Sequence, residues 1–333
     1  MVMVATFGCQ QSAGLSPAFA IMKTFIQVSE IWVPSKDRTM LEFHGGLYGP
    51  HAVFRAASEG LCFGFDEGLP GKAWAARHPV ILKDLQDSYF KRARAAQQAG
   101  LMCGMALPIF AGDYLLAVLV FFCGGDDERV GVIELWHNDP AQSHDMALVD
   151  GHYGIAESFE RVARNTSFRR GFGLPGGIWQ SAMPEILSDL WHSERFLRHD
   201  DARRVGLSKG LGLPSLYAPG QNYVMAFLSA LGTPIARRFE IWVPDAGGAA
   251  LALASGDCDL DRDFVAAHAS TRLSAGESPV RLAWATGLPA LSASIGEDGS
   301  PVGLSARKAG LDAMLAFPVL ESGHCKAIVA MYF

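Results

Sequence analysis

Thiols and imidazoles are the groups in this 333-residue chain whose chemistry could support redox, metal or catalytic sites. None of the six cysteines forms a Cys-x-x-Cys pair, and none of the ten histidines forms a His-x-x-x-His or His-Glu-x-x-His pair. A repeated disulfide or zinc framework would repeat its ligands, and these residues do not recur at a regular step. We therefore expect free thiols, no metal site and no catalytic residues, since no triad or carboxylate pair converges in the sequence.

Two glycine-proline turns, Gly68-Leu69-Pro70-Gly71 and Gly173-Leu174-Pro175-Gly176, are a second candidate for chemistry. A helix that begins at such a turn could present its free amides to an anion. The same residues are also typical of a tight turn that only docks a helix on a sheet. Both interpretations remain open at this stage.

The tryptophans show how the elements that would position such groups are organised. Trp74, Trp179 and Trp284 are 105 positions apart (179 − 74 and 284 − 179). This period is too long for a solenoid repeat of about 20–50 residues and suits a small domain. We predict three domains, over residues 1–124, 125–232 and 233–333, with a flanking helix over residues 16–28. The junctions leave room only for turns, so the units should pack directly on one another.

Each unit contains the same order of elements. It opens with a β-branched strand that carries Glu-x-Trp, and a helix follows around Phe54, Phe159 or Phe264. In the second unit, Ile155, Phe159 and Val162 have the spacing of a buried helical face. The tryptophan that recurs every 105 residues lies on a second helix, which should end near a proline. Two further strands close the unit, so the predicted fold class is α/β (α+β), with helices on a mixed or antiparallel sheet.

Composition excludes several classes of protein. Half of the residues are hydrophobic and 19% are charged, which is typical of a globular chain. The net charge of −6 disfavours a nucleic-acid partner. No apolar run reaches the length of about 18 residues that a membrane span needs, and no charged signal region precedes Lys23. We expect a soluble cytoplasmic protein.

The first unit resembles a GAF domain, the small-molecule-sensing module of phytochromes, cyclic-nucleotide phosphodiesterases and bacterial regulators. The resemblance rests on EIWVP, GFDEGLPGKAWAARHPVILKDL, AGLMCGMALPIF and YLLAVLVFF, and GLPGGIWQSAMPEILSDL repeats its core in the second unit. This form is also similar to the GAF-like region of plant NIN-like regulators. The third unit departs from it, because SAGESPVRLAW lacks the GLPG glycines. The cyclic-nucleotide residue set and the bilin-binding Cys-His pair are absent.

The resemblance implies a non-catalytic regulatory protein that binds a small molecule and acts on a protein effector. We expect the ligand in the first unit, in a pocket lined by Phe43, Phe63, Trp74, Cys103 and Met105. The sequence identifies no cofactor. One alternative is a scaffold of degenerate GAF domains that works through its surfaces. A weaker one is a redox enzyme similar to GAF-type methionine sulfoxide reductases, which would depend on Cys62 and Cys103.

Overall fold

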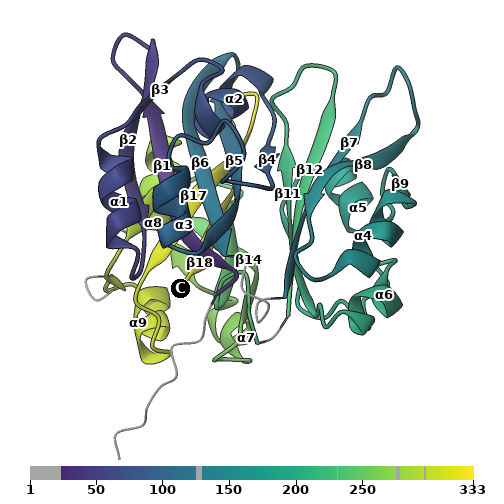
Figure 1. Cartoon of the computed structure of the whole chain (residues 1–333). Helices are drawn as coiled ribbons and strands as arrows, with labels where there is room; N and C mark the ends of the chain where they lie inside the picture. The colour runs from purple at the N-terminus through teal and green to yellow at the C-terminus, as the bar shows by residue number, and fades with distance from the viewer. Residues whose placement is uncertain (1–23, 125–129, 231, 275–277, 296–297) are drawn as a thin grey trace, which may run out of the picture.

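The structure is a computed structural model that describes residues 24–124, 130–230, 232–274, 278–295 and 298–333. Within these residues the chain forms three six-stranded antiparallel sheets with helices packed on them. This arrangement confirms the predicted α/β architecture of three repeated units. The second unit stands to the right of the first in Figure 1, and the yellow-green third unit lies behind and below the first. No described helix is long and apolar enough to cross a membrane.

The first unit has the strand order β3-β2-β1-β6-β5-β4. Its elements are β1 (Ile26–Pro34), β2 (Met40–Leu47), α1 (Ala52–Glu59), β3 (Cys62–Gly64), α2 (Gly68–Ala76), β4 (Val80–Leu82), α3 (Ala93–Gln98), β5 (Leu101–Ala111) and β6 (Tyr114–Gly124).

The other two units repeat this order, β9-β8-β7-β12-β11-β10 and β15-β14-β13-β18-β17-β16. The second contains β7 (Gly131–Asn138), β8 (Asp145–His152), α4 (Glu157–Arg164), β9 (Ser167–Arg169), α5 (Gly173–Ser181), β10 (Glu185–Leu187), α6 (His199–Arg204), β11 (Lys209–Ser215) and β12 (Asn222–Ser229). The third contains β13 (Arg238–Pro244), β14 (Leu251–Cys258), α7 (Phe264–His268), β15 (Arg272–Leu273), α8 (Pro279–Thr286), β16 (Ala290–Ser292), α9 (Pro301–Lys308), β17 (Met314–Glu321) and β18 (His324–Tyr332).

The predicted domain boundaries, after residues 124 and 232, fall between the sheets, since β6 ends at Gly124 and β12 at Ser229. The helix predicted over residues 16–28 is wrong at its end, because residues 26–28 belong to β1, and residues 16–23 lie outside the described residues. The predicted buried face of α4 is also wrong in part. Ile155 precedes the helix and is 55% exposed, while Phe159 and Ala163 form the buried face.

The glycine-proline turns serve the backbone of the helix that follows. Gly68 has φ +58°, and a side chain at Gly71 would place its Cβ 2.2 Å from the carbonyl oxygen of Gly64. Two amides of this turn already donate to backbone carbonyls, since Asp66 N–H binds Gly71 O and Gly71 N–H binds Glu67 O, both at 3.0 Å. These bonds favour the tight-turn interpretation over the anion site.

The third unit begins the equivalent helix without these glycines. Ser278 accepts a hydrogen bond from the amide of Arg281 at 3.4 Å, and Pro279 occupies the first turn of α8. A serine cap and a proline therefore begin this helix, in place of the glycine-proline turn of the other units. Residues 275–277, which include Gly276 and Glu277, lie outside the described residues.

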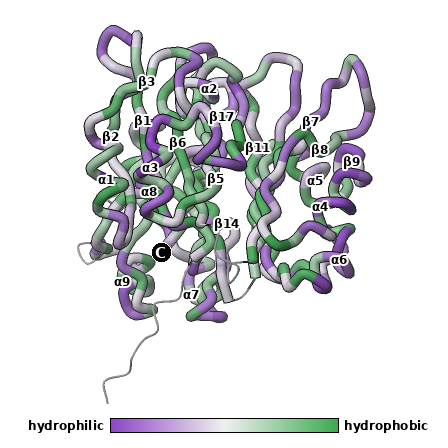
Figure 2. Tube along the Cα trace, viewed as in Figure 1, coloured by the Kyte–Doolittle hydropathy of each residue, from purple (hydrophilic) through white to green (hydrophobic). Residues whose placement is uncertain are grey.

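Both faces of the central strands are buried. In β5, Cys103, Met105 and Leu107 face the centre of the molecule, while Gly104 and Ala106 face the helices of the unit. A strand that is buried on both faces is a continuous apolar run, as β5 and β6 are. The strands are accordingly green in Figure 2, whereas the outer helices α4, α6 and α9 carry more hydrophilic residues.

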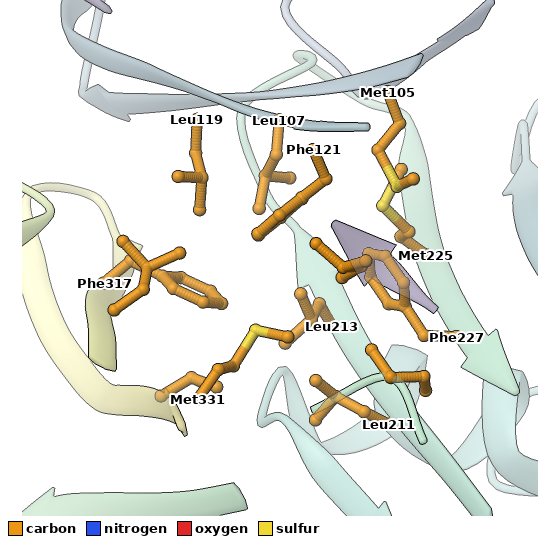
Figure 3. Close-up of a cluster of buried hydrophobic side chains, with 14 of the residues drawn as sticks. Met105, Leu107, Leu119, Phe121, Leu211, Leu213, Met225, Phe227, Phe317 and Met331 are labelled. Atoms are coloured by element: carbon orange, nitrogen blue, oxygen red, sulfur yellow. The ribbon is translucent and has the colours of Figure 1, made fainter. Parts of the chain in front are cut away.

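The inner faces of all three sheets share one apolar core, which confirms that the units pack directly on one another. Figure 3 shows side chains from the three sheets pointing toward one another. Phe121 of β6 makes edge contacts with Phe227 of β12 and Phe317 of β17, with ring centroids 6.0 and 6.5 Å apart. The core inside each unit, between sheet and helices, is separate from this one.

The sheet edges close the three units into a ring. Strand β4 contacts β8, β10 contacts β14, and β16 contacts β2. In each case the fourth strand of one unit meets the second strand of the next, and the third unit returns to the first. The chain is thus one body with approximate threefold symmetry and three equivalent seams.

Candidate ligand-binding cleft

The five residues predicted to line a pocket of the first unit lie on two different faces of its sheet. Phe43, Phe63 and Trp74 belong to the aromatic cluster under the helices. Cys103 and Met105 belong to the central core on the opposite face. The structure therefore brings the first three together and separates them from the last two, because β5 presents the opposite alternation to the one that the prediction assumed.

Aromatic side chains fill the space under the helices of the first unit. Trp32 is fully buried and makes edge contacts with Phe43 and Phe63, at centroid distances of 5.4 and 4.7 Å. Trp74 is half-buried and contacts the ring of Phe65, which is 64% exposed, at 5.3 Å. Trp74 therefore lies at the rim of this cluster.

The two cysteines of the redox alternative lie in contrasting places. Cys62 is exposed on the edge strand β3, whereas Cys103 is fully buried in the central core. Burial raises the pKa of the Cys103 thiol far above its ordinary range. The thiolate is the nucleophilic form of cysteine, so this environment makes Cys103 unreactive.

A buried ion pair that no sequence motif predicts lies under the helices of the first unit. Glu30 is fully buried and binds both terminal nitrogens of Arg92, with Nη2 3.0 Å from Oε2. The same carboxylate accepts hydrogen bonds from Trp32 Nε1 at 3.0 Å, Tyr48 Oη at 2.9 Å and Ser58 Oγ at 2.8 Å. The carboxylate is thus surrounded by donors, which is what a charge needs when it leaves water.

The second unit repeats the pair. Glu134 binds Arg198 through two hydrogen bonds of 2.6 and 2.7 Å, and it accepts further bonds from Trp136 at 2.9 Å and Tyr153 at 3.2 Å. Ala163 stands at the position that Ser58 holds in the first unit, so the Glu134 carboxylate has one hydrogen-bond donor fewer than the Glu30 carboxylate.

The third unit builds the same kind of pair from different positions. Arg238, two residues before Glu240 on β13, lies with Nη2 2.6 Å from Glu240 Oε1. Trp242 donates to the carboxylate at 2.7 Å, as in the other units, but the tyrosine is Tyr332 of β18, at 3.1 Å. Burial raises the pKa of Glu240, and the arginine opposes this shift. Val302, which is buried, stands where the other units have their arginine.

A cleft of about 550 Å³ opens at the seam between the second and third units. One wall comes from the loop after β10 and the start of β11. The other comes from the end of β14, the loop after it and the start of α7. The lining residues are Ser188, Asp189, Trp191, Ser208, Lys209, Gly256, Asp257, Cys258, Asp259, Asp261, Arg262, Phe264 and Val265. Its volume is in the usual range for small-molecule sites, about 300–1,000 Å³.

An ammonium group crosses this cleft. Lys209 of the second unit binds Asp257 and Asp259 of the third, and its side chain is only 11% exposed. Burial lowers the pKa of Lys209, but the hydrogen bonds to the two carboxylates outweigh burial, so its net pKa is raised and it stays charged. Burial raises the pKa of Asp259, and the lysine opposes that shift.

Comparison with known proteins places the first unit in a family. The family model described as GAF domain matches residues 22–150. The first unit is a GAF domain. The other two units have its strand order and its helices, so the chain consists of three tandem GAF-like units. No curated protein matches the chain.

Several solved structures are similar over about one unit. The A. aeolicus nlh2 GAF domain in an inactive state is 19% identical, over 31% of this chain and 60% of that one, with a TM-score of 0.25. The GAF domain of a phosphoenolpyruvate-protein phosphotransferase from Coxiella burnetii is 16% identical, over 29% and 56%, with a TM-score of 0.25. A GAF domain/HD domain protein from Geobacter sulfurreducens is 14% identical, over 30% and 63%, with a TM-score of 0.26. This chain thus spans about 60% of the length of these structures.

The cleft opens where small residues of the GAF-like units replace large ones. Strand register shows that Ser188 stands where the first unit has Lys83, and Cys258 stands where the second unit has Tyr153. At the seam between the first two GAF-like units, Lys83 forms an ion pair with Asp150 at 2.5 Å, while Tyr153 lies in the core of the second unit and donates to Glu134. The Lys83 side chain therefore crosses that seam, whereas Ser188 at the equivalent position lines the cleft between the second and third units.

Sequence signals for these features exist but are faint. The Glu-x-Trp segment occurs in all three units, and Arg92 and Arg198 are 106 positions apart (198 − 92), close to the repeat. The cleft has no such signal, because its two walls come from different GAF-like units and no single motif contains both.

Proposed function

We propose that this chain is a non-catalytic regulatory protein, built from three GAF-like units, that binds a small molecule at the seam between the second and third units. A GAF domain supports a sensory or regulatory role at the level of the family. The observation that carries the proposal is the cleft of about 550 Å³, whose lining includes the largely buried charged side chains of Lys209, Asp257 and Asp259. Ligand sites in proteins are concave and combine apolar walls with a few polar groups that orient the ligand.

The cleft is a better location for the ligand than the predicted pocket of the first unit. Under the helices of that unit, the Glu30–Arg92 pair and the ring of Trp32 already occupy the interior. A ligand there would have to break the buried ion pair and its hydrogen bonds, which is costly. The cleft needs no such displacement.

Native mass spectrometry of the purified chain tests this proposal. We expect a co-purified small molecule, or an added one, to be lost when Ser188→Trp fills the cleft with a bulky ring from an exposed position. Ser158→Trp is the matched control, because Ser158 is exposed on α4 and does not line the cleft. A molecule that still binds to the Ser188→Trp variant but not to the Trp74→Ala variant would place the binding site in the first unit.

A scaffold function is the second candidate, and the filled interiors of the units favour it. Three fully buried carboxylates, Glu30, Glu134 and Glu240, occupy the space under the helices of their units. If no small molecule binds and Ser188→Trp leaves every property of the protein unchanged, the scaffold proposal would replace the sensor.

The redox alternative has little support from the surroundings of Cys103, which lies in the central core. Cysteine-dependent reduction of methionine sulfoxide that is lost in Cys103→Ser would revive it. We expect no turnover in either protein.

A further inference from the structure

The charge of the cleft identifies the kind of ligand that would enter it. Four carboxylates line the cleft, Asp189, Asp257, Asp259 and Asp261, against the two cationic groups of Lys209 and Arg262. Lys209 forms ion pairs with two of these carboxylates, Asp257 and Asp259, and Arg262 is exposed to solvent. The walls are therefore acidic overall, and carboxylates come from both units.

Two acceptor groups of the third unit's wall lack partners. Asp259 is nine-tenths buried, and its Oδ2 atom has no hydrogen-bond donor among the described residues. The carboxylate of Asp261 has no hydrogen-bond or ion-pair partner within the described part of the chain. Asp261 is partly exposed, whereas Asp259 Oδ2 is buried, and a buried acceptor without a donor is costly and is normally satisfied by water, an ion or a ligand.

The protein itself shows which group fits this wall. The ammonium of Lys209 reaches across the seam and lies between the carboxylates of Asp257 and Asp259. A primary ammonium has three donors on one compact charge and so can satisfy several carboxylates together. Trp191 and Val265 add apolar surface that suits a short methylene chain.

We propose that the cleft between the second and third units binds a small organic cation with primary ammonium groups, of the alkyl diamine class. The proposal rests on the proposed ligand-binding function and specifies its ligand. One ammonium would bind Asp261 and the free acceptor side of the third unit's wall, and the chain would lie along Trp191. An anionic ligand would face the unpartnered carboxylates instead and be repelled.

Three probes with the same four-methylene spacer test the charge requirement by calorimetric titration. Putrescine carries two ammonium groups, 1,4-butanediol carries two hydroxyls, and adipate carries two carboxylates. We expect binding of putrescine alone. Asp261→Asn should weaken it about tenfold or more, because a hydrogen bond between two charged groups is lost. Asp263→Asn is the matched control, since Asp263 is exposed and lies outside the lining.

The outcomes separate this inference from the proposed function. If adipate or butanediol binds and putrescine does not, with binding abolished by Ser188→Trp, the ligand class is wrong and the cleft remains a binding site. If Asp263→Asn weakens putrescine binding as much as Asp261→Asn, putrescine is attracted by the negative charge of the whole region and not by a specific site, and the inference fails. If no probe binds and native mass spectrometry finds no molecule that depends on Ser188, both proposals fall.

Discussion

Removal of Arg92 should destabilise the protein strongly, although this residue touches no ligand cleft. Arg92→Met leaves the Glu30 carboxylate, which is fully buried, without its cation. Breaking a buried pair from one side costs about 3–5 kcal/mol. We expect about 3 kcal/mol, at the lower end, because three neutral donors still reach the carboxylate. Urea unfolding at pH 7, followed by circular dichroism and tryptophan fluorescence, measures the loss.

The second unit provides a graded comparison. Arg198→Met should cost about 1 kcal/mol more than Arg92→Met, because Glu134 retains only two neutral donors after the change. The matched control is Arg55→Met. Arg55 pairs with Glu59 on the surface of α1, where its side chain is 62% exposed, and such pairs contribute about 0.3–0.5 kcal/mol.

A double-mutant cycle isolates the pair from the packing of the arginine stem. Glu30→Gln and Arg92→Met should each destabilise the protein, and the double variant should cost at least about 1.5 kcal/mol less than their sum. The reasoning is refuted if the two changes are additive, or if Arg92→Met costs no more than Arg55→Met. In either case the arginine would contribute through its contacts with aromatic rings alone.

Three further perturbations test the core, the histidines and the turns. Phe121→Ala should lower the free energy of unfolding by about 3–5 kcal/mol and lower the midpoint of a single unfolding transition, because this ring contacts both other sheets. Separate transitions in calorimetry would contradict a common core. Burial lowers the pKa of His152, so its neutral form stabilises the fold, and that stability is complete above the unfolded pKa of about 6.5 and lost as pH falls below it. Unfolding midpoints between pH 7 and 5 should fall less steeply in His152→Gln than in the wild type, and equal slopes would contradict this expectation. Gly71→Ala should cost about 1–3 kcal/mol or more from a clash with backbone, whereas Gly60→Ala, with open space around it, should be near neutral in thermal melts.

The repeated units could be predicted because their signals are local and recur. The tryptophan step placed Trp74 on a helix after a turn, and the helix ends at Ala76, shortly before Pro79. Propensity, glycine and proline act within a few residues, so each copy confirms the others. The third copy shows the limit, because Ser278 and Pro279 begin its helix by capping instead of by glycine.

The faces of the strands could not be predicted in the same way. A strand exposed on one side alternates between apolar and polar residues, but β5 is apolar on both sides. Nothing in its sequence distinguishes the face of Cys103 from that of Ala106. The assignment depends on how the three sheets meet, which is a property of the whole ring.

Divergence of the third unit links its unusual ion pair to the cleft. The position that holds a tyrosine in the first two units, and there donates to the buried glutamate, is Cys258 in the third. Cys258 also lines the cleft. The glutamate still needs a hydroxyl donor and a cation once that tyrosine is absent. Tyr332 and Arg238 supply them from strands β18 and β13 of the same unit, and Arg238 pairs across the sheet with Cys258. The third unit therefore replaces the tyrosine donor within its own sheet, and the position of that tyrosine, Cys258, forms part of one wall of the cleft.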